Sequence, residues 1–334
     1  ICGSTAVETA IKIAIAYHRA KGDSKRFRFV GRERGYHGMN IGATTVGGMI
    51  NNVKTFASVL MPGVQHMRHT HLPEHKFVKG QPDTGVEMAE DLERIAMNFG
   101  GENIAACIVE PIAGSTGTLV PPKGYLKRIR EICDKHGILL IFDEVITGWG
   151  RTGSAFASQE FGVTPDMITM AKATTNGVIP MGVVAVKEEM YDAVLDSSKN
   201  PEGTPELFHG YTYSGIPAAV AAGLAVQDIF DKEDIFNRAK EMSPYFQDGL
   251  HSLKDLKEVV SIRGYGMMGG IEIKMKDKPG KSGFQTFKHC YDAGVNFKNT
   301  GDTLIIAPQF ICEKKHIDEI IEKLRTGISN YSKS

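Results

Sequence analysis

Strand and helix patterns alternate over the first two thirds of the 334-residue chain, and this alternation constrains its fold more than any other feature. Residues 138–142 form a continuous apolar run, which is typical of a strand buried on both faces. Further strands are expected at 26–30, 105–110, 167–170 and 182–186, and helices at 124–136 and 217–229, with an amphipathic segment that opens at residue 2 and runs to about 20. This order predicts an α/β protein with a parallel or mixed sheet covered by helices.

The pattern changes after about residue 235. We expect a helix to about 253, strands at 259–263, 269–273 and 304–307, a helix near 284–293 and a last helix from 313. Residues 1–234 are therefore predicted to form a large domain, and residues 235–334 a smaller α+β domain. The glycine-rich segment 264–270 opens no helix and lacks a following acidic residue at the usual distance, so we interpret it as a bend between strands rather than a dinucleotide turn.

Lys172 ends the apolar strand pattern of residues 165–171 abruptly. A lysine in apolar surroundings has a lowered pKa, and its neutral amine can attack a carbonyl and form a Schiff base. On this stretch alone, a solvated lysine just past the strand is the more frequent alternative.

Asp143 and Glu144 follow the buried run 138–142, at the carboxyl end of its strand. Ligands bind at that end of an open α/β sheet, so a carboxylate there is a candidate for function. A helix N-cap or a turn former is an equally good interpretation of the same two residues.

The opening segment Gly3-Ser4-Thr5 precedes an amphipathic helix and has the composition of a phosphate-binding loop. Glycine permits close backbone approach, and free N–H groups at a helix start favour an anion. An ordinary N-cap has the same composition. Tyr36, in Arg34-Gly-Tyr-His-Gly, could stack on a flat ring, although a packed loop aromatic is the commoner case.

A phosphate-binding loop, a stacking aromatic, a strand-end aspartate and a strand-end lysine together describe a site for pyridoxal 5'-phosphate. On five motifs, the chain resembles the class III (subgroup II) pyridoxal-phosphate-dependent aminotransferases, and within them the omega-amino acid:pyruvate (β-alanine:pyruvate) aminotransferases. The motifs are Gly-Arg-Glu-Arg-Gly-Tyr-His-Gly (31–38), Ile-Val-Glu-Pro-Ile-Ala-Gly (108–114), Phe-Asp-Glu-Val-Ile-Thr-Gly (142–148), Pro-Asp-Met-Ile-Thr-Met-Ala-Lys (165–172) and His-Gly-Tyr-Thr-Tyr-Ser-Gly (209–215).

The resemblance implies the fold type I (aspartate-aminotransferase-like) arrangement, a mostly parallel mixed sheet with flanking helices and a smaller C-terminal domain. It implies a ping-pong transfer of an amino group from an omega-amino acid or amine, such as β-alanine, to a keto acid such as pyruvate. Lys172 would form the Schiff base and move the proton, and Asp143 would pair with the pyridine nitrogen.

The same resemblance implies the other cofactor contacts. Val145 and Tyr36 would pack on the two faces of the ring, with His37 beside them. Gly3, Ser4 and Thr5 would hold the phosphate, and Thr212 would reach the phosphate bound to the neighbouring subunit of a homodimer or tetramer with its active site at the interface. Glu110 matches a glutamate near the cofactor, or equally a carboxylate that anchors a loop.

Three departures from the family pattern affect these expectations. Cys2 and Thr5 stand where the family usually has serine and glutamate. Lys298 stands where the most similar relatives have an arginine that grips the carboxylate of the keto acid, a two-pronged contact that lysine cannot copy. Lys298 could still attract a single carboxylate or a sulfonate, which leaves taurine open as a donor; it could also be a solvated loop lysine.

The chain has no initiator methionine and begins inside the phosphate-binding pattern, whereas the family has a long segment before it. We therefore expect a fragment that lacks part of the small domain and of the substrate pocket. With 39 basic and 39 acidic residues, the charge gives no steering towards nucleic acid or an anionic membrane. Five scattered cysteines, no membrane-length apolar run and no visible signal peptide favour the cytoplasm.

Other interpretations stay open at this level. Related folds also catalyse racemisation, isomerisation and decarboxylation with the same cofactor, and a truncated chain could fold without chemistry. The histidines at 66, 69, 71 and 75 have a spacing that could hold zinc, but no regular helix or knuckle frames them, so we expect loop histidines and no metal site.

Overall fold

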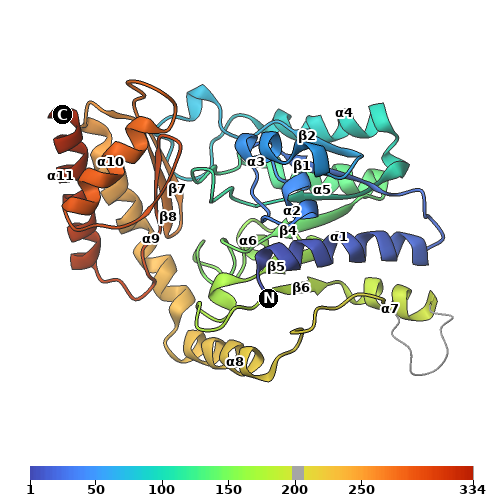
Figure 1. The fold of residues 1–334 in the computed structure, drawn as a ribbon. Helices are drawn as coiled ribbons and strands as arrows, with labels where there is room; N and C mark the ends of the chain where they lie inside the picture. The colour runs from blue at the N-terminus through green and yellow to red at the C-terminus, as the bar shows by residue number, and fades with distance from the viewer. Residues whose placement is uncertain (198–206, 334) are drawn as a thin grey trace.

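The computed structural model describes residues 1–197 and 207–333 (Figure 1). Six strands of this described part form one sheet in the order β2-β1-β3-β4-β5-β6, in which neighbours are parallel except for the antiparallel pair β5 and β6. The strands are β1 (Arg28–Arg32), β2 (Val64–Met67), β3 (Ile104–Val109), β4 (Leu139–Asp143), β5 (Met167–Met170) and β6 (Val183–Val186). The mixed, mostly parallel sheet expected from the sequence is confirmed.

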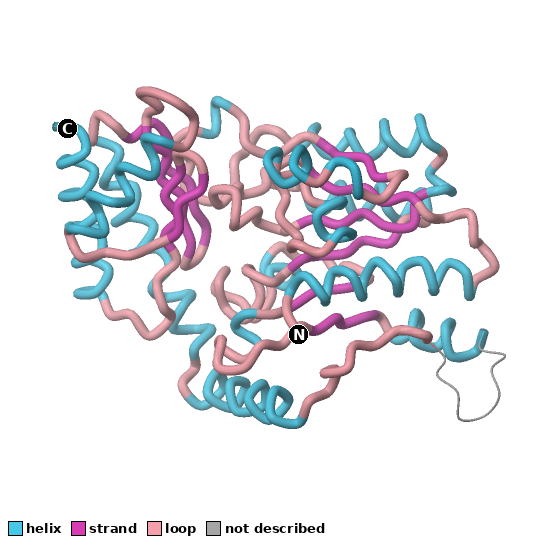
Figure 2. The backbone as a smooth tube through the Cα atoms, viewed as in Figure 1, coloured by secondary structure: helices cyan, strands magenta, loops and turns pink. Residues whose placement is uncertain are grey.

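Helices cover both faces of this sheet (Figures 1 and 2). Side chains alternate along β4, so that Leu140 and Phe142 pack in the core under α4 (Glu90–Phe99) and α5 (Tyr125–His136). Leu139 and Ile141 pack in the opposite core with α1 (Gly3–Ala20). Because both faces are buried, β4 contains only apolar residues until its last position, Asp143.

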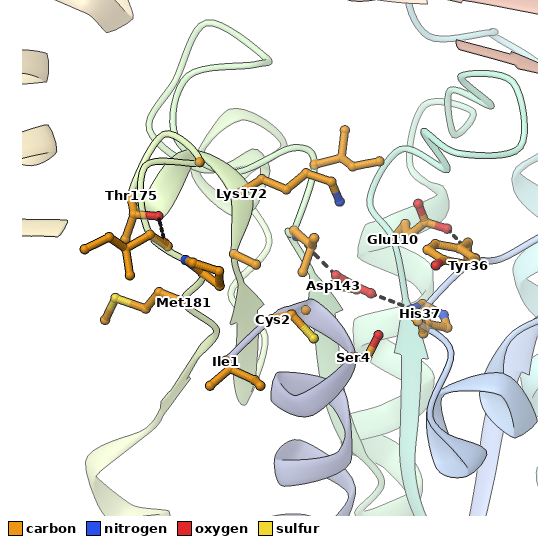
Figure 3. A pocket seen from close by; sticks show the side chains of 18 residues that line it. Ile1, Cys2, Ser4, Tyr36, His37, Glu110, Asp143, Lys172, Thr175 and Met181 are labelled. Carbon is orange, nitrogen blue, oxygen red and sulfur yellow. Dashed lines mark hydrogen bonds and ion pairs between the residues drawn. The ribbon is translucent and has the colours of Figure 1, made fainter. Parts of the chain in front are cut away.

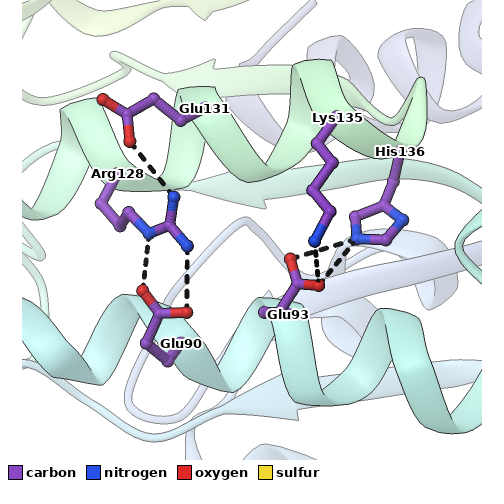
Figure 4. A network of polar contacts seen from close by, with 6 residues as sticks. All are labelled: Glu90, Glu93, Arg128, Glu131, Lys135 and His136. Atoms are coloured by element: carbon purple, nitrogen blue, oxygen red, sulfur yellow. Dashed lines mark hydrogen bonds and ion pairs between the residues drawn. The ribbon is translucent and has the colours of Figure 1, made fainter.

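The exposed sides of α4 and α5 are joined by a polar network (Figure 4). Arg128 donates hydrogen bonds to both carboxylate oxygens of Glu90, at 2.6 and 3.2 Å, and a third to Glu131. Lys135 donates to Glu93 at 2.7 Å, and His136 contacts the same carboxylate. Exposed ion pairs of this kind contribute about 0–1 kcal/mol each, so burial in the two cores dominates the stability of this layer.

A second sheet, of four strands within the described residues, has the antiparallel order β7-β8-β10-β9. Its strands are β7 (Val259–Tyr265), β8 (Met268–Ile273), β9 (Lys298–Thr300) and β10 (Thr303–Ile306). The helices α9 (Ile235–His251), α10 (Lys281–Asp292) and α11 (Lys314–Lys333) pack against it (Figure 1). The expected bend at 264–270 is confirmed, because β7 and β8 are joined at Gly266, which has a left-handed φ of 57°.

The remaining elements connect these parts. They are the helices α2 (Ile41–Val46), α3 (Ile50–Thr55), α6 (Ala157–Glu160), α7 (Glu188–Ser197) and α8 (Pro217–Lys232), and the 3-10 turns η1 (Ala57–Val59), η2 (Pro73–His75), η3 (Val86–Ala89), η4 (Gly101–Asn103), η5 (Lys172–Thr174) and η6 (Ser252–Asp255). None of the described helices is both long and apolar enough to cross a membrane.

The histidines considered for zinc serve other contacts. His66 hydrogen-bonds the carbonyl oxygen of Gly47, and His75 bonds that of Thr84, so each anchors a loop. Over residues 1–197 and 207–333, no group of three or more His, Cys, Asp or Glu side chains is placed to hold a metal ion.

Candidate active site

Three candidate residues lie at the carboxyl edge of the large sheet, each at the end of a neighbouring strand. Glu110 follows β3, Asp143 is the last residue of β4, and Lys172 comes two residues after β5. Since β3, β4 and β5 are adjacent and parallel, their ends meet at one edge. The three side chains line a common cavity of about 250 Å³ (Figure 3).

Lys172 extends across this cavity toward the side that holds Asp143 and Glu110 (Figure 3). Although more than a third of the residue is solvent-exposed, burial of its amine lowers the lysine pKa, and the positive charge of Lys298 lowers it further. The carboxylates of Asp143 and Glu110 act in the opposite direction. Lys172 also has a φ of 44°, a left-handed conformation that is rare for lysine and that accumulates at functional sites.

Asp143 is held by one hydrogen bond on each carboxylate oxygen. The backbone N–H of Val145 donates to Oδ1 at 3.1 Å, and Nδ1 of His37 lies 2.7 Å from Oδ2. Both side chains are buried, with 4% of Asp143 and 3% of His37 exposed. The other ring nitrogen of His37, Nε2, is buried without a partner among the described residues.

Glu110 contacts two loops and also lines the cavity. Its carboxylate accepts the backbone N–H of Tyr36 at 2.8 Å and that of Gly114 at 3.1 Å, so it anchors two loops. It also lines the cavity beside Lys172. Burial raises the pKa of Glu110, which makes this carboxyl easier to protonate than an exposed one.

The first turn of α1 contributes Gly3 and Ser4 to the wall of the cavity. An added Cβ at Gly38 would lie 2.4 Å from Ser4 Oγ, and one at Gly3 would lie 3.0 Å from a methyl carbon of Val145. Ser4 Oγ accepts the backbone N–H of Met39. The two glycines therefore keep the chain close-packed around an opening at a helix N-terminus, where an anion is favoured.

These features fit pyridoxal 5'-phosphate. The cavity offers an amine of lowered pKa, a fixed buried carboxylate and an aromatic side chain, and a glycine-lined helix N-terminus lies at its edge. Of the eleven residues that the sequence predicts for the site, eight line the cavity: Gly3, Ser4, Tyr36, His37, Glu110, Asp143, Val145 and Lys172.

The other three predicted residues lie outside the cavity wall. The Thr5 hydroxyl bonds the carbonyl oxygen of Cys2 and faces a neighbouring cavity. Thr212 lies in a turn before α8, and neither cavity includes it among its lining residues. Lys298 is part of β9 rather than a loop, and its Nζ lies 5.9 Å from the centre of the Tyr36 ring.

Part of the wall was not expected from the sequence. Ile179, Pro180 and Met181 lie between η5 and β6 and form the side nearest to Lys172 along the chain. Their apolar character carries no catalytic signal, so only the fold could place them.

Comparison with known proteins agrees with this geometry. Residues 1–328 match the model of the aminotransferase class-III family. The chain is 51% identical over 325 residues to an omega-aminotransferase of Caulobacter vibrioides, covering 97% of this chain and 73% of that protein. It is 43% identical over 329 residues to a beta-alanine–pyruvate aminotransferase of Pseudomonas aeruginosa, covering 98% of this chain and 73% of that protein.

The fold is shared with solved structures. The omega transaminase from Pseudomonas jessenii in complex with PMP superposes with a TM-score of 0.93 at 28% identity, over 99% of this chain and 74% of that one. The chain belongs to the class-III aminotransferases. It is thus a pyridoxal-phosphate-dependent aminotransferase of fold type I, and the family, fold, enzyme class and cofactor expected from the sequence are confirmed.

Proposed function

We propose that this aminotransferase moves an amino group from an omega-amino acid, such as β-alanine, to a keto acid, such as pyruvate. The observation that carries this proposal is the position of Lys298, a cation close to Tyr36 and electrostatically coupled to Lys172. A substrate whose amine reacts with the cofactor aldehyde beside Lys172, and whose carboxylate lies further off, would meet this charge. The names of the two relatives above support the same substrate class.

Each cofactor contact is proposed from its place in the cavity. When bound, pyridoxal 5'-phosphate supplies an aldehyde that takes up amino groups and a ring that withdraws electrons. Asp143, fixed by His37 and Val145, would accept a hydrogen bond from the protonated ring nitrogen. Tyr36 and Val145 would bound the ring, and Gly3 and Ser4 would hold the phosphate.

Lys172 would bind the aldehyde carbon and later act as the base. Its lowered pKa gives a larger neutral fraction near pH 7 than an exposed lysine has. The neutral Nζ would take the proton from the donor carbon that bears the amino group. Ile179 and Pro180 would exclude water from this step.

Lys298 would attract the substrate carboxylate as a point charge. Because an ammonium cannot form the two-pronged contact of a guanidinium, its selectivity between carboxylate and sulfonate should be low. A taurine-type donor therefore remains an alternative within the same family.

We also propose a homodimer whose interface includes α8 and the segment before it. Large apolar side chains are exposed there, among them Phe208 at 77%, Tyr213 at 64% and Leu224 at 61%. Such a patch is typical of a protein–protein interface. Thr212 lies within this surface, which suits a threonine that completes the site of the partner subunit.

Two broader proposals follow the same reasoning. Residues 1–234, with the large sheet, and residues 235–334, with the second sheet, would be separate domains joined at the start of α9. The cytoplasm suits the chain because its five cysteines, all in the described part, are free thiols.

The proposed function is tested by absorbance of the chain loaded with pyridoxal 5'-phosphate, before and after β-alanine is added. The Schiff-base band should fade with β-alanine and return with pyruvate, and it should be missing from Lys172→Ala. A band that β-alanine, taurine and simple amines all leave unchanged would refute aminotransfer by this site. If β-alanine and taurine act equally well, the low selectivity assigned to Lys298 is supported.

A further inference from the structure

A second cavity of about 390 Å³ lies next to the cofactor cavity and shares Val145, Ile146 and Lys172 with it. We call it the distal cavity. Its other walls are the loop at 114–118, the segment after β4, and the C-terminal residues 295–298 and 305–310. A molecule in the distal cavity would thus have one end beside the Lys172 side chain.

The lining of the distal cavity combines an apolar wall with positive charge. Three cationic side chains, Lys172, Lys298 and Arg151, contribute to it. None of its lining residues, which all belong to the described part of the chain, is acidic. Most of the remainder is apolar, including Met268, Phe297, Ile305, Ile306 and Phe310. This composition is complementary to an organic anion with a hydrocarbon body.

Arg151 is a fixed cation in this wall. Its Nη1 donates to the carbonyl oxygens of Met267 at 2.8 Å and Pro308 at 2.6 Å, and its guanidinium carbon lies 4.3 Å from the centre of the Phe310 ring. Burial lowers the pKa of Arg151 to about 10. Among the described residues, no carboxylate pairs with it.

A buried guanidinium held only by carbonyl dipoles and an aromatic ring lacks a counter-charge, and an incoming carboxylate would supply one. Arginine is well suited to this contact, since its remaining N–H groups can bind a carboxylate in a two-pronged manner. A ligand with its hydrocarbon chain between Lys172 and Arg151 would bind about fourfold more tightly for each methylene that is buried.

We propose that the distal cavity binds the hydrocarbon chain of omega-amino acids longer than β-alanine and that Arg151 binds their terminal carboxylate. This inference rests on the proposed function, because it requires the amine of the same molecule to react with the cofactor beside Lys172. Lys298 would serve short donors, whereas Arg151 would serve long ones.

The test compares donors of increasing length in the holoenzyme: β-alanine, 4-aminobutanoate, 6-aminohexanoate and 8-aminooctanoate. Hexylamine serves as the partner of 6-aminohexanoate that lacks the carboxylate. The rate at which each donor alone removes the Schiff-base band gives its second-order rate constant. Calorimetric binding of octanoate, which has no amine, provides a readout independent of the reaction.

The expected result is a tenfold or greater advantage of 6-aminohexanoate over hexylamine, and measurable binding of octanoate. Arg151→Gln should remove both, and Arg151→Lys should retain part of each. The control Arg19→Gln changes an exposed arginine at the end of α1 and should alter neither. If Arg151→Gln does not fold, Ala307→Phe, which fills the cavity and keeps Arg151, should lower the ratio of the 6-aminohexanoate rate to the β-alanine rate.

The outcomes separate the two proposals. If no donor removes the band, the proposed function fails. If β-alanine reacts but 6-aminohexanoate has no advantage over hexylamine, or if Arg151→Gln keeps that advantage, the inference about the distal cavity is overturned and the proposed function stands.

Discussion

Exchange of His37 tests whether its hydrogen bond, rather than its bulk, holds Asp143 in place. Asparagine can place an N–H near the position of Nδ1, which lies 2.7 Å from Asp143, but it leaves space where the rest of the ring was. Glutamine fills more of that space, but its amide is one bond farther from the backbone. The two substitutions therefore separate the contribution of the hydrogen bond from that of packing.

The size of the expected stability loss follows from the burial of the two side chains, of which 3% of His37 and 4% of Asp143 is exposed. Loss of a hydrogen bond to a buried charged group costs about 1.5–3 kcal/mol. We expect His37→Gln to lower the free energy of unfolding of the cofactor-free chain by about 2 kcal/mol, and His37→Asn to lower it by less. His37→Gln should also weaken binding of pyridoxal 5'-phosphate by about tenfold or more, since 1.4 kcal/mol corresponds to a factor of ten.

Urea unfolding followed by fluorescence measures this difference, because Trp149 is the single tryptophan of the chain and packs against Phe156. The denaturant slope should be the same in the three proteins. If His37→Asn were the less stable variant, packing would dominate and the positioning role of His37 would be refuted.

Three further predictions concern pH, the phosphate loop and the interface. Burial and neighbouring cations lower the pKa of His71 from 6.5 to about 3, so as pH falls below 6.5 the unfolded chain binds a proton that the folded chain does not. From neutral pH to pH 5, the free energy of unfolding should therefore fall by about 2 kcal/mol less in His71→Gln than in the unsubstituted chain, and an equal fall in both proteins would contradict this. Gly38→Ala forces a Cβ against Ser4 at a φ of 121°, whereas Gly22→Ala, at a φ of 82°, places its Cβ in open space. In a spectral titration, Gly38→Ala should therefore weaken cofactor binding far more than Gly22→Ala does. Equal affinities of the two variants would rule out the loop as a close-packed site. Leu224→Asp should shift the sedimentation coefficient from dimer to monomer, and an unchanged coefficient would remove α8 from the interface.

The sequence was most informative where burial on both faces imposes an unbroken apolar pattern. The strand ending at Asp143 was predicted to within a residue, because β4 has no polar residue before its end. The strand β2 was missed, since its four residues include Gln65 and His66, and all but Met67 are only partly buried at the sheet edge. The start of β1 was expected two residues too early, because the alternation of arginine and phenylalanine begins at Arg26, whereas the pairing with β3 begins at Arg28.

Some residues of the candidate site could likewise be predicted from the sequence, and others could not. Lys172, Asp143 and Glu110 could be found because each follows a recognisable strand, and parallel strands bring their ends together. The His37–Asp143 hydrogen bond joins residues 106 positions apart and has no local signal. The apolar wall at Ile179–Met181 and the cation Arg151 likewise acquire meaning only through the folded chain.

Lys172 is expected to be the residue that bonds the cofactor. Borohydride reduction of the chain loaded with pyridoxal 5'-phosphate fixes that bond, and mass analysis of the peptides then locates it. We predict the reduced cofactor on the peptide containing Lys172, and its absence from that peptide when Lys172→Ala is treated in the same way. Labelling at Lys298 instead, or labelling that is spread over exposed lysines and unaffected by Lys172→Ala, would show that Lys172 does not bond the cofactor.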